Sequence, residues 1–218
     1  MAGHTLGRVQ RGLEALYRVE TGVEVADFVV GEALRDAISP ARRPREQLLV
    51  HEADGELALA LFICPAALAN RGCHDPARRL GDHNLGDFLL AVEGVSHFIY
   101  AIWCAQAARP VSQLELELQA EVDKYVTCLL TADPEVAVSS ELRRRLFGDA
   151  CYDPDLDHDE QARYRAANDN AWRYASWLER AFVAPRRIPE MLAELRRFYR
   201  LGLAGKLAAI ARADQRAA

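Results

Sequence analysis

The sequence predicts a mainly α protein with one β-hairpin, an α+β fold in which a pair of core helices follows the hairpin and two long helices come last. Three patterns support this prediction. Residues 88–108 form a long apolar run, residues 114–129 carry apolar side chains at steps of three and four, and two alternating segments flank Asp54-Gly55. Steps of three and four place side chains on one face of a helix, whereas alternation with a period of two is typical of strands.

The segment before the hairpin is predicted to contain two helices, over residues 4–20 and 23–38. The second helix should end at Ser39-Pro40, because the residue before a proline avoids helical backbone angles. An arginine-rich linker then leads to the hairpin, which we expect over residues 47–63.

The hairpin register follows from the Asp-Gly dipeptide at its centre. Asp-Gly tolerates the positive φ angles of a type I′ turn, which joins two strands through a loop of two residues. Such a loop places Val50 opposite Leu59 and Leu48 opposite Leu61. Because side chains alternate across a strand, all four then lie on one face of the sheet.

Two core helices are predicted next, over residues 87–108 and 112–130. Arg109-Pro110 separates them, and the sequence from Ser112 to Glu115 has the spacing of a capping box, which starts the second helix. The apolar run of the first helix is long enough to cross a membrane, but it carries charged and polar residues within it. We therefore expect a buried core helix and no membrane span.

The C-terminal region is predicted to be helical, with a short helix over residues 139–147 and two long helices over 159–182 and 189–213. The sequence suggests a division into an α+β core, residues 1–132, and a C-terminal helical region, residues 133–218, packed on that core.

Charge is unevenly distributed along the chain. The formal net charge is −5, which argues against a general nucleic-acid-binding protein. From Arg186 onward there are eight basic and three acidic residues, so this tail carries about +5 and the rest of the chain about −10. Arg196, Arg197 and Arg200 border an apolar stripe in the last helix and are candidates for contacting a protein partner or a second copy of the chain.

The cysteines and the N-terminal residues suggest a cytoplasmic protein. The five cysteines are odd in number and include no CxxC pair, which fits free thiols in a reducing compartment. The first twenty residues are amphipathic rather than apolar, unlike a signal peptide.

The first core helix contains two ionisable residues that should be buried, Glu93 and His97. The second core helix carries Glu117 and Glu121 at the same spacing of four, so the members of each pair share one helix face. Burial of an ionisable group is costly unless the group is paired, hydrogen-bonded or bound to a metal. Something must therefore compensate Glu93 and His97.

The order of hairpin, core helix and second helix resembles that of a minimal gluzincin metallopeptidase. Residues 92–96, VEGVS, lie over the HExxH motif of that family, and residues 117–121, ELQAE, lie over its ExxAD motif. The resemblance implies that Glu93 matches the general base, Glu117 the third zinc ligand and Glu121 an acid that supports the ligands.

The match departs from the family at both zinc histidines. Val92 and Ser96 stand at their positions, and His97 is one residue out of phase, a rotation of about 100° on a helix. The resemblance, which covers residues 47–126, therefore implies a degenerate metallopeptidase core, a pseudoenzyme without the family's zinc histidines.

Three interpretations of the Glu and His residues remain open. Besides the degenerate core, Glu93, His97 and Glu117 could themselves bind zinc, iron or manganese, with Glu121 as base or supporting acid. Alternatively, Glu93 and His97 compensate each other or the backbone, while the two later glutamates pair with Lys124 and solvent. The favoured function is a non-catalytic regulatory or scaffolding protein that acts through protein contacts, and the alternative is a metal-dependent hydrolase or oxidase.

Overall fold

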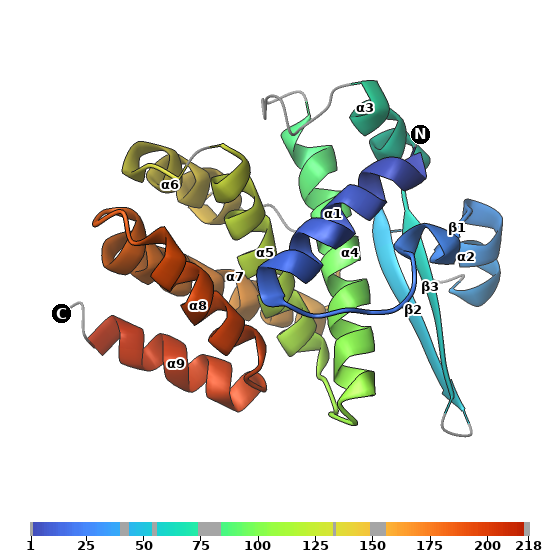
Figure 1. The fold of residues 1–218 in the computed structure, drawn as a ribbon. Helices are drawn as coiled ribbons and strands as arrows, with labels where there is room; N and C mark the ends of the chain where they lie inside the picture. The colour runs from blue at the N-terminus through green and yellow to red at the C-terminus, as the bar shows by residue number, and fades with distance from the viewer. Residues whose placement is uncertain are drawn as a thin grey trace. The chain divides into compact units, whose positions relative to one another are not determined.

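The structure is a computed structural model that describes residues 2–39, 44–53, 56–73, 84–132, 134–148 and 156–215. Over these ranges the protein is mainly helical, with a small three-stranded sheet and long C-terminal helices, which confirms the predicted fold class (Figure 1). The chain forms two compact units. The first comprises residues 1–15 and 19–110, and the second residues 16–18 and 111–218.

The first unit contains the sheet and the apolar core helix. Its elements in chain order are α1 (Ala2–Tyr17, without its last two residues), η1 (Val25–Phe28), β1 (Val29–Val30), α2 (Glu32–Ile38), β2 (Glu46–Ala53), β3 (Glu56–Ile63), α3 (Pro65–Cys73) and α4 (Leu85–Gln106).

The predicted hairpin is confirmed with its register. β2 pairs antiparallel with β3, with Val50 opposite Leu59 and Leu48 opposite Leu61. The turn dipeptide between the strands lies outside the described residues. β3 is the central strand because β1 pairs parallel with its other edge, a pairing that no local pattern in the sequence predicts.

The predicted helix over residues 23–38 is wrong. Residues 25–28 form a 3-10 turn, Val29 and Val30 form β1, and only residues from Glu32 onward are helical. Two β-branched valines suit a strand, and here they pair with Leu61 and Phe62 of β3. This long-range pairing overrides the local helical pattern.

Helix α4 is the core helix of the first unit and packs against α3, β2 and β3. Ala91, Val92 and Val95 are fully buried in it. The helix is long and apolar enough to cross a membrane, and 67% of its most apolar window is buried within the protein. It therefore has the burial of a core helix, as the sequence predicts.

The second unit is a helical assembly around α5. Its elements in chain order are the end of α1, α5 (Gln113–Thr131), α6 (Val136–Arg143), η2 (Arg144–Gly148), α7 (His158–Leu178), η3 (Glu179–Val183), α8 (Ile188–Tyr199) and α9 (Leu203–Gln215). α5 begins at Ser112, whose hydroxyl accepts a hydrogen bond from the Glu115 amide as predicted. It packs along α7.

The last predicted helix, residues 189–213, is two helices. The chain leaves the helical path after Tyr199 and resumes it at Leu203, next to Gly202, a residue of low helix propensity. The break redirects α9, so that Lys206 is fully buried and donates a hydrogen bond to the side-chain oxygen of Gln119 on α5.

Buried polar groups connect the elements of the second unit. The Tyr17 hydroxyl donates to the Asp123 carboxylate, and the Gln119 amide donates to the same carboxylate at 2.8 Å. The Tyr17 ring stacks on Tyr199 with 3.9 Å between ring centroids. Each of these side chains is nearly inaccessible to solvent, so the network holds the end of α1 against α5 and α8.

Candidate metal centre

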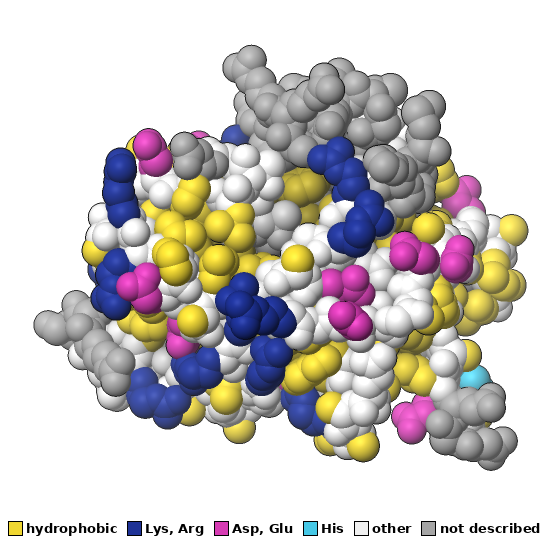
Figure 2. Space-filling model, viewed as in Figure 1, with side chains coloured by type: hydrophobic (Ala, Val, Ile, Leu, Met, Phe, Trp, Pro, Cys, Tyr) yellow, Lys and Arg dark blue, Asp and Glu magenta, His cyan; other side chains and the backbone are white. Residues whose placement is uncertain are grey.

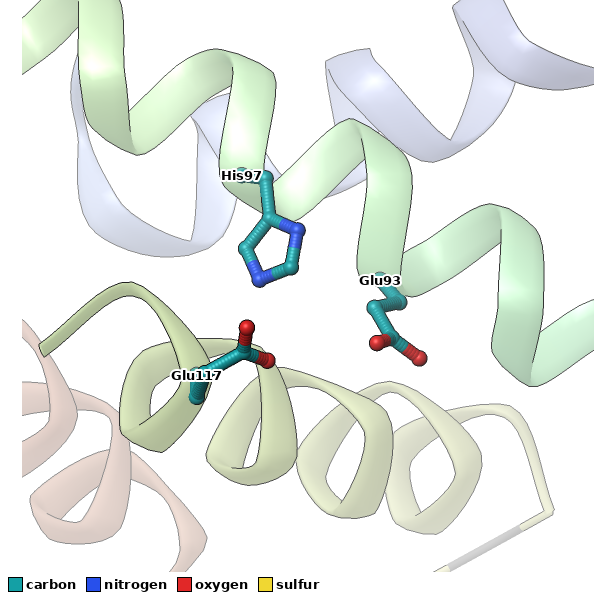
Figure 3. Close-up of side chains that lie close together, drawn as sticks. All are labelled: Glu93, His97 and Glu117. Carbon is teal, nitrogen blue, oxygen red and sulfur yellow. The ribbon is translucent and has the colours of Figure 1, made fainter. Parts of the chain in front are cut away.

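Helix α4 presents Glu93 and His97 one turn apart on the same side, as their spacing predicts (Figure 3). His97 is only 6% exposed, and Glu93 is half-buried. The helix that carries them is otherwise apolar, so it brings the two polar groups into the protein interior.

A residue of the sheet lies beside the imidazole. Oε1 of Glu46, the first residue of β2, is 3.5 Å from Nδ1 of His97, and both side chains are 8% exposed. A carboxylate at this distance favours a proton on Nδ1, which leaves Nε2 of the neutral ring with its lone pair. A histidine that binds a metal through Nε2 has this tautomer.

The close approach of β2 to α4 depends on Gly94, which lies between Glu93 and His97 on the helix. A Cβ atom at this position would lie 3.1 Å from Cγ and Oε1 of Glu46 and from Cδ1 of Leu61. These distances are tighter than ordinary van der Waals contact. The absent side chain of Gly94 therefore makes room for Glu46 next to His97.

Glu117, on α5, completes a group with the two residues of α4. One potential ligand atom from each of Glu93, His97 and Glu117 can be chosen so that all three lie within 4.8 Å of one another (Figure 3). His97 is buried, and Glu117, like Glu93, is half-buried. The protein thus contains a buried Glu/His/Glu triad that could bind metal.

The donor set fits a divalent transition metal. Zinc, iron and manganese all accept imidazole nitrogen together with carboxylate oxygen. Metal–ligand bonds of about 2.0–2.2 Å would keep neighbouring donor atoms roughly 3–4 Å apart.

Glu121, the fourth predicted site residue, lies in a different arrangement. Its Oε1 accepts a hydrogen bond of 2.6 Å from Nζ of Lys124, one turn further along α5. Both side chains are largely buried, at 16% and 12% exposed. The pairing of a glutamate with Lys124, which one interpretation of the sequence expected, is therefore present for Glu121.

Sequence reasoning missed Glu46. It follows the arginine-rich linker, where a charged residue looks like part of a solvent-exposed connection. Its contact with His97 arises because the sheet packs on α4, and no local pattern reports that packing. The only sequence signal was the apolar alternation that begins directly after it and marks the start of the strand.

The three candidate arginines of the C-terminal region divide into two kinds. Arg197 forms an ion pair of 2.6 Å with Glu194 on its own helix. Arg196 and Arg200 instead donate to backbone carbonyls at the end of α1, those of Leu16 at 2.8 Å and of Tyr17 at 3.1 Å. The sequence pattern could not distinguish these roles.

Comparisons with known proteins identify no relative, because no protein-family model, no curated protein and no solved structure matches the chain.

Proposed function

We propose that the protein binds a divalent transition-metal ion through His97, Glu93 and Glu117, and that Glu46 orients the imidazole. The observation that carries the proposal is the buried His97, with Glu93 one turn away and the Glu46 carboxylate 3.5 Å from Nδ1. Metal-binding histidines almost always present their second ring nitrogen to a carboxylate, a carbonyl or water. The arrangement is thus that of a ligand held ready for a metal.

The same donor set suggests what the ion would do. A metal with three protein ligands keeps a coordination position for water, whereas structural zinc sites are closed by four protein ligands. Such an ion, when bound, supplies Lewis acidity to its water or substrate. If the metal-bound site is catalytic, metal-dependent hydrolysis is therefore the activity that we propose.

A non-catalytic regulatory or scaffolding role is the second candidate, as a pseudoenzyme on a degenerate metallopeptidase core. Val92, which stands where the resembled family has a zinc histidine, is fully buried and offers no ligand atom. Cleavage of a peptide library by the purified protein, abolished by a chelator and restored by metal, would contradict this candidate.

Elemental analysis of untagged protein tests metal binding directly. We expect about one equivalent of zinc, iron or manganese in the wild type and its loss in His97→Ala. His51→Ala is the matched control, because His51 lies exposed on β2 and should leave the metal content unchanged.

A second measurement separates loss of a ligand from loss of the fold. Circular dichroism of His97→Ala should show nearly wild-type helical content. If neither the isolated protein nor protein titrated with zinc or manganese holds stoichiometric metal, the proposal is wrong, and Glu93 and His97 are residues of the protein core only.

A further inference from the structure

Three arginine side chains of the second unit converge at the end of α1. Arg18 directly follows this helix, Arg196 lies in the last turn of α8, and Arg200 directly follows α8. Nε of Arg196 donates to the carbonyl of Leu16, and a terminal nitrogen of Arg200 donates to those of Tyr17 and Arg18. The guanidinium groups of Arg196 and Arg200 are therefore held against consecutive carbonyls of the segment that contains Arg18.

These three arginines differ from others of the second unit in their partners. Other arginines of this unit form ion pairs with carboxylates, among them Arg143, Arg144, Arg163, Arg173, Arg187 and Arg197. Within the described part of the chain, Arg18, Arg196 and Arg200 have no carboxylate within ion-pair distance. These three guanidinium groups thus form no ion pair with an acid from these ranges.

The partial negative charge at the carboxyl end of α1 compensates only part of the positive charge of these arginines. The carboxyl end of a helix carries about half a negative charge, and arginines near it are stabilising. Three guanidinium groups carry three positive charges, so most of the charge remains after capping. Partial burial, followed by the charges of Arg18 and Arg200, lowers the pKa of Arg196, which agrees with mutual repulsion in the group.

The group also retains hydrogen-bond donors. A guanidinium has five N–H groups, and carbonyl partners from the described residues occupy one nitrogen of Arg196 and two of Arg200. Arg18 and Arg200 are exposed, and Arg196 is half-buried, so a ligand can approach from solvent. Dark blue Lys and Arg side chains gather near the middle of the face shown in Figure 2.

We propose that Arg18, Arg196 and Arg200 form a binding site for the phosphate group of a small phosphomonoester. A phosphate dianion presents several acceptor oxygens and a charge near −2, which matches several guanidinium forks better than a single carboxylate does. The carbonyl contacts of Arg196 and Arg200 hold two of these forks in place before the ligand arrives, which lowers the entropic cost of binding.

Titration calorimetry on the full chain tests the site, with inorganic phosphate and free phosphoserine as probes and acetate at matched ionic strength as reference. Arg18→Gln is the main variant because, within the described ranges, its guanidinium makes no hydrogen bond that supports the fold. Arg197→Gln is the matched control, since it removes the same charge from α8 but from a residue already paired with Glu194.

We expect saturable binding of phosphate and phosphoserine, weakened about tenfold or more in Arg18→Gln and little changed in Arg197→Gln. Arg196→Lys, which keeps the charge but loses the fork, should also weaken binding. Equal weakening in Arg18→Gln and Arg197→Gln would mean general charge attraction and would overturn the proposal. Binding of acetate as tight as that of phosphate, or no saturable binding at all, would overturn it too.

Discussion

Nδ1 of His97 on α4 lies 3.5 Å from Oε1 of Glu46, the residue that begins β2, and both side chains are almost completely buried. This relationship connects the sheet to the core helix at the point where that helix carries its ionisable residues. The contact places Nδ1 of the imidazole on the side of the ring that faces the sheet.

Replacement of Glu46 should weaken metal binding without removing a ligand. In Glu46→Gln the side chain keeps its size but loses the charge that fixes the imidazole tautomer. We expect metal affinity to fall about 10–100-fold, as measured by competition with a chromophoric chelator. Glu52→Gln, at the exposed end of the same strand, is the control. Wild-type affinity in Glu46→Gln would show that Glu46 does not orient His97.

A methyl group at Gly94 should disturb the packing of β2 on α4. The added Cβ would lie 3.1 Å from both Glu46 and Leu61, so the strand or these side chains must shift. We expect Gly94→Ala to lower the free energy of unfolding by about 1–3 kcal/mol in urea titrations. At Gly86 on the same helix an added Cβ meets no heavy atom of the described residues within 4 Å, so Gly86→Ala should be neutral or stabilising by up to about 1 kcal/mol. Similar losses at both positions would contradict this explanation.

Removal of the Tyr17 hydroxyl should lower the free energy of unfolding more than removal of a hydroxyl that is hydrogen-bonded to a neutral group. Tyr17 donates to the buried Asp123 carboxylate, whereas Tyr125 shares a buried hydrogen bond of 2.7 Å with the Ser139 hydroxyl. We expect Tyr17→Phe to lower the free energy of unfolding by about 1.5–3 kcal/mol and Tyr125→Phe by about 0.5–1.5 kcal/mol. Chemical denaturation of the two variants in parallel measures both losses. A larger loss in Tyr125→Phe than in Tyr17→Phe would show that the charge of Asp123 does not strengthen its hydrogen bond with Tyr17.

Stability should fall in alkaline solution. Burial raises the pKa of Cys128 from 9.0 to about 12 and that of Tyr125 from 10.0 to about 12, and it raises the pKa of Tyr17 well above 10.0. Because the folded state favours the protonated forms, this stability is fully present below the ordinary pKa values. It is lost as the pH rises from about 9 toward 12.

The contribution of Cys128 can be isolated. We expect the midpoint of urea unfolding to decline between about pH 9 and pH 10.5, and to decline less steeply in Cys128→Ala, since each titrating group contributes at most about 1.4 kcal/mol per pH unit. Cys64→Ala serves as control because Cys64 is not fully buried. An unchanged slope in Cys128→Ala would show that burial of this thiol does not govern the alkaline loss.

Several parts of the candidate site were predictable from spacing alone. Polar residues four apart in an apolar run imply one buried helix face, so the sequence was sufficient to identify Glu93 and His97. Glu117 was predicted as a candidate because it lies four residues before Glu121 on the second core helix. The spacing of Glu121 is equally regular, but this residue lies against Lys124, and spacing cannot distinguish a ligand from the partner of a lysine.

By itself, the sequence determined the hairpin with its register, the core helix α4, the capped start of α5 and the helix face that Glu93 and His97 share. Each depends on a period of two or 3.6, or on a cap within one turn, and these are local properties of the chain. Only the tertiary structure decided that Val29 and Val30 form a strand, that Glu46 lies beside His97, and that α9 separates from α8. These features require contacts between residues far apart in sequence, whose energies no local pattern contains.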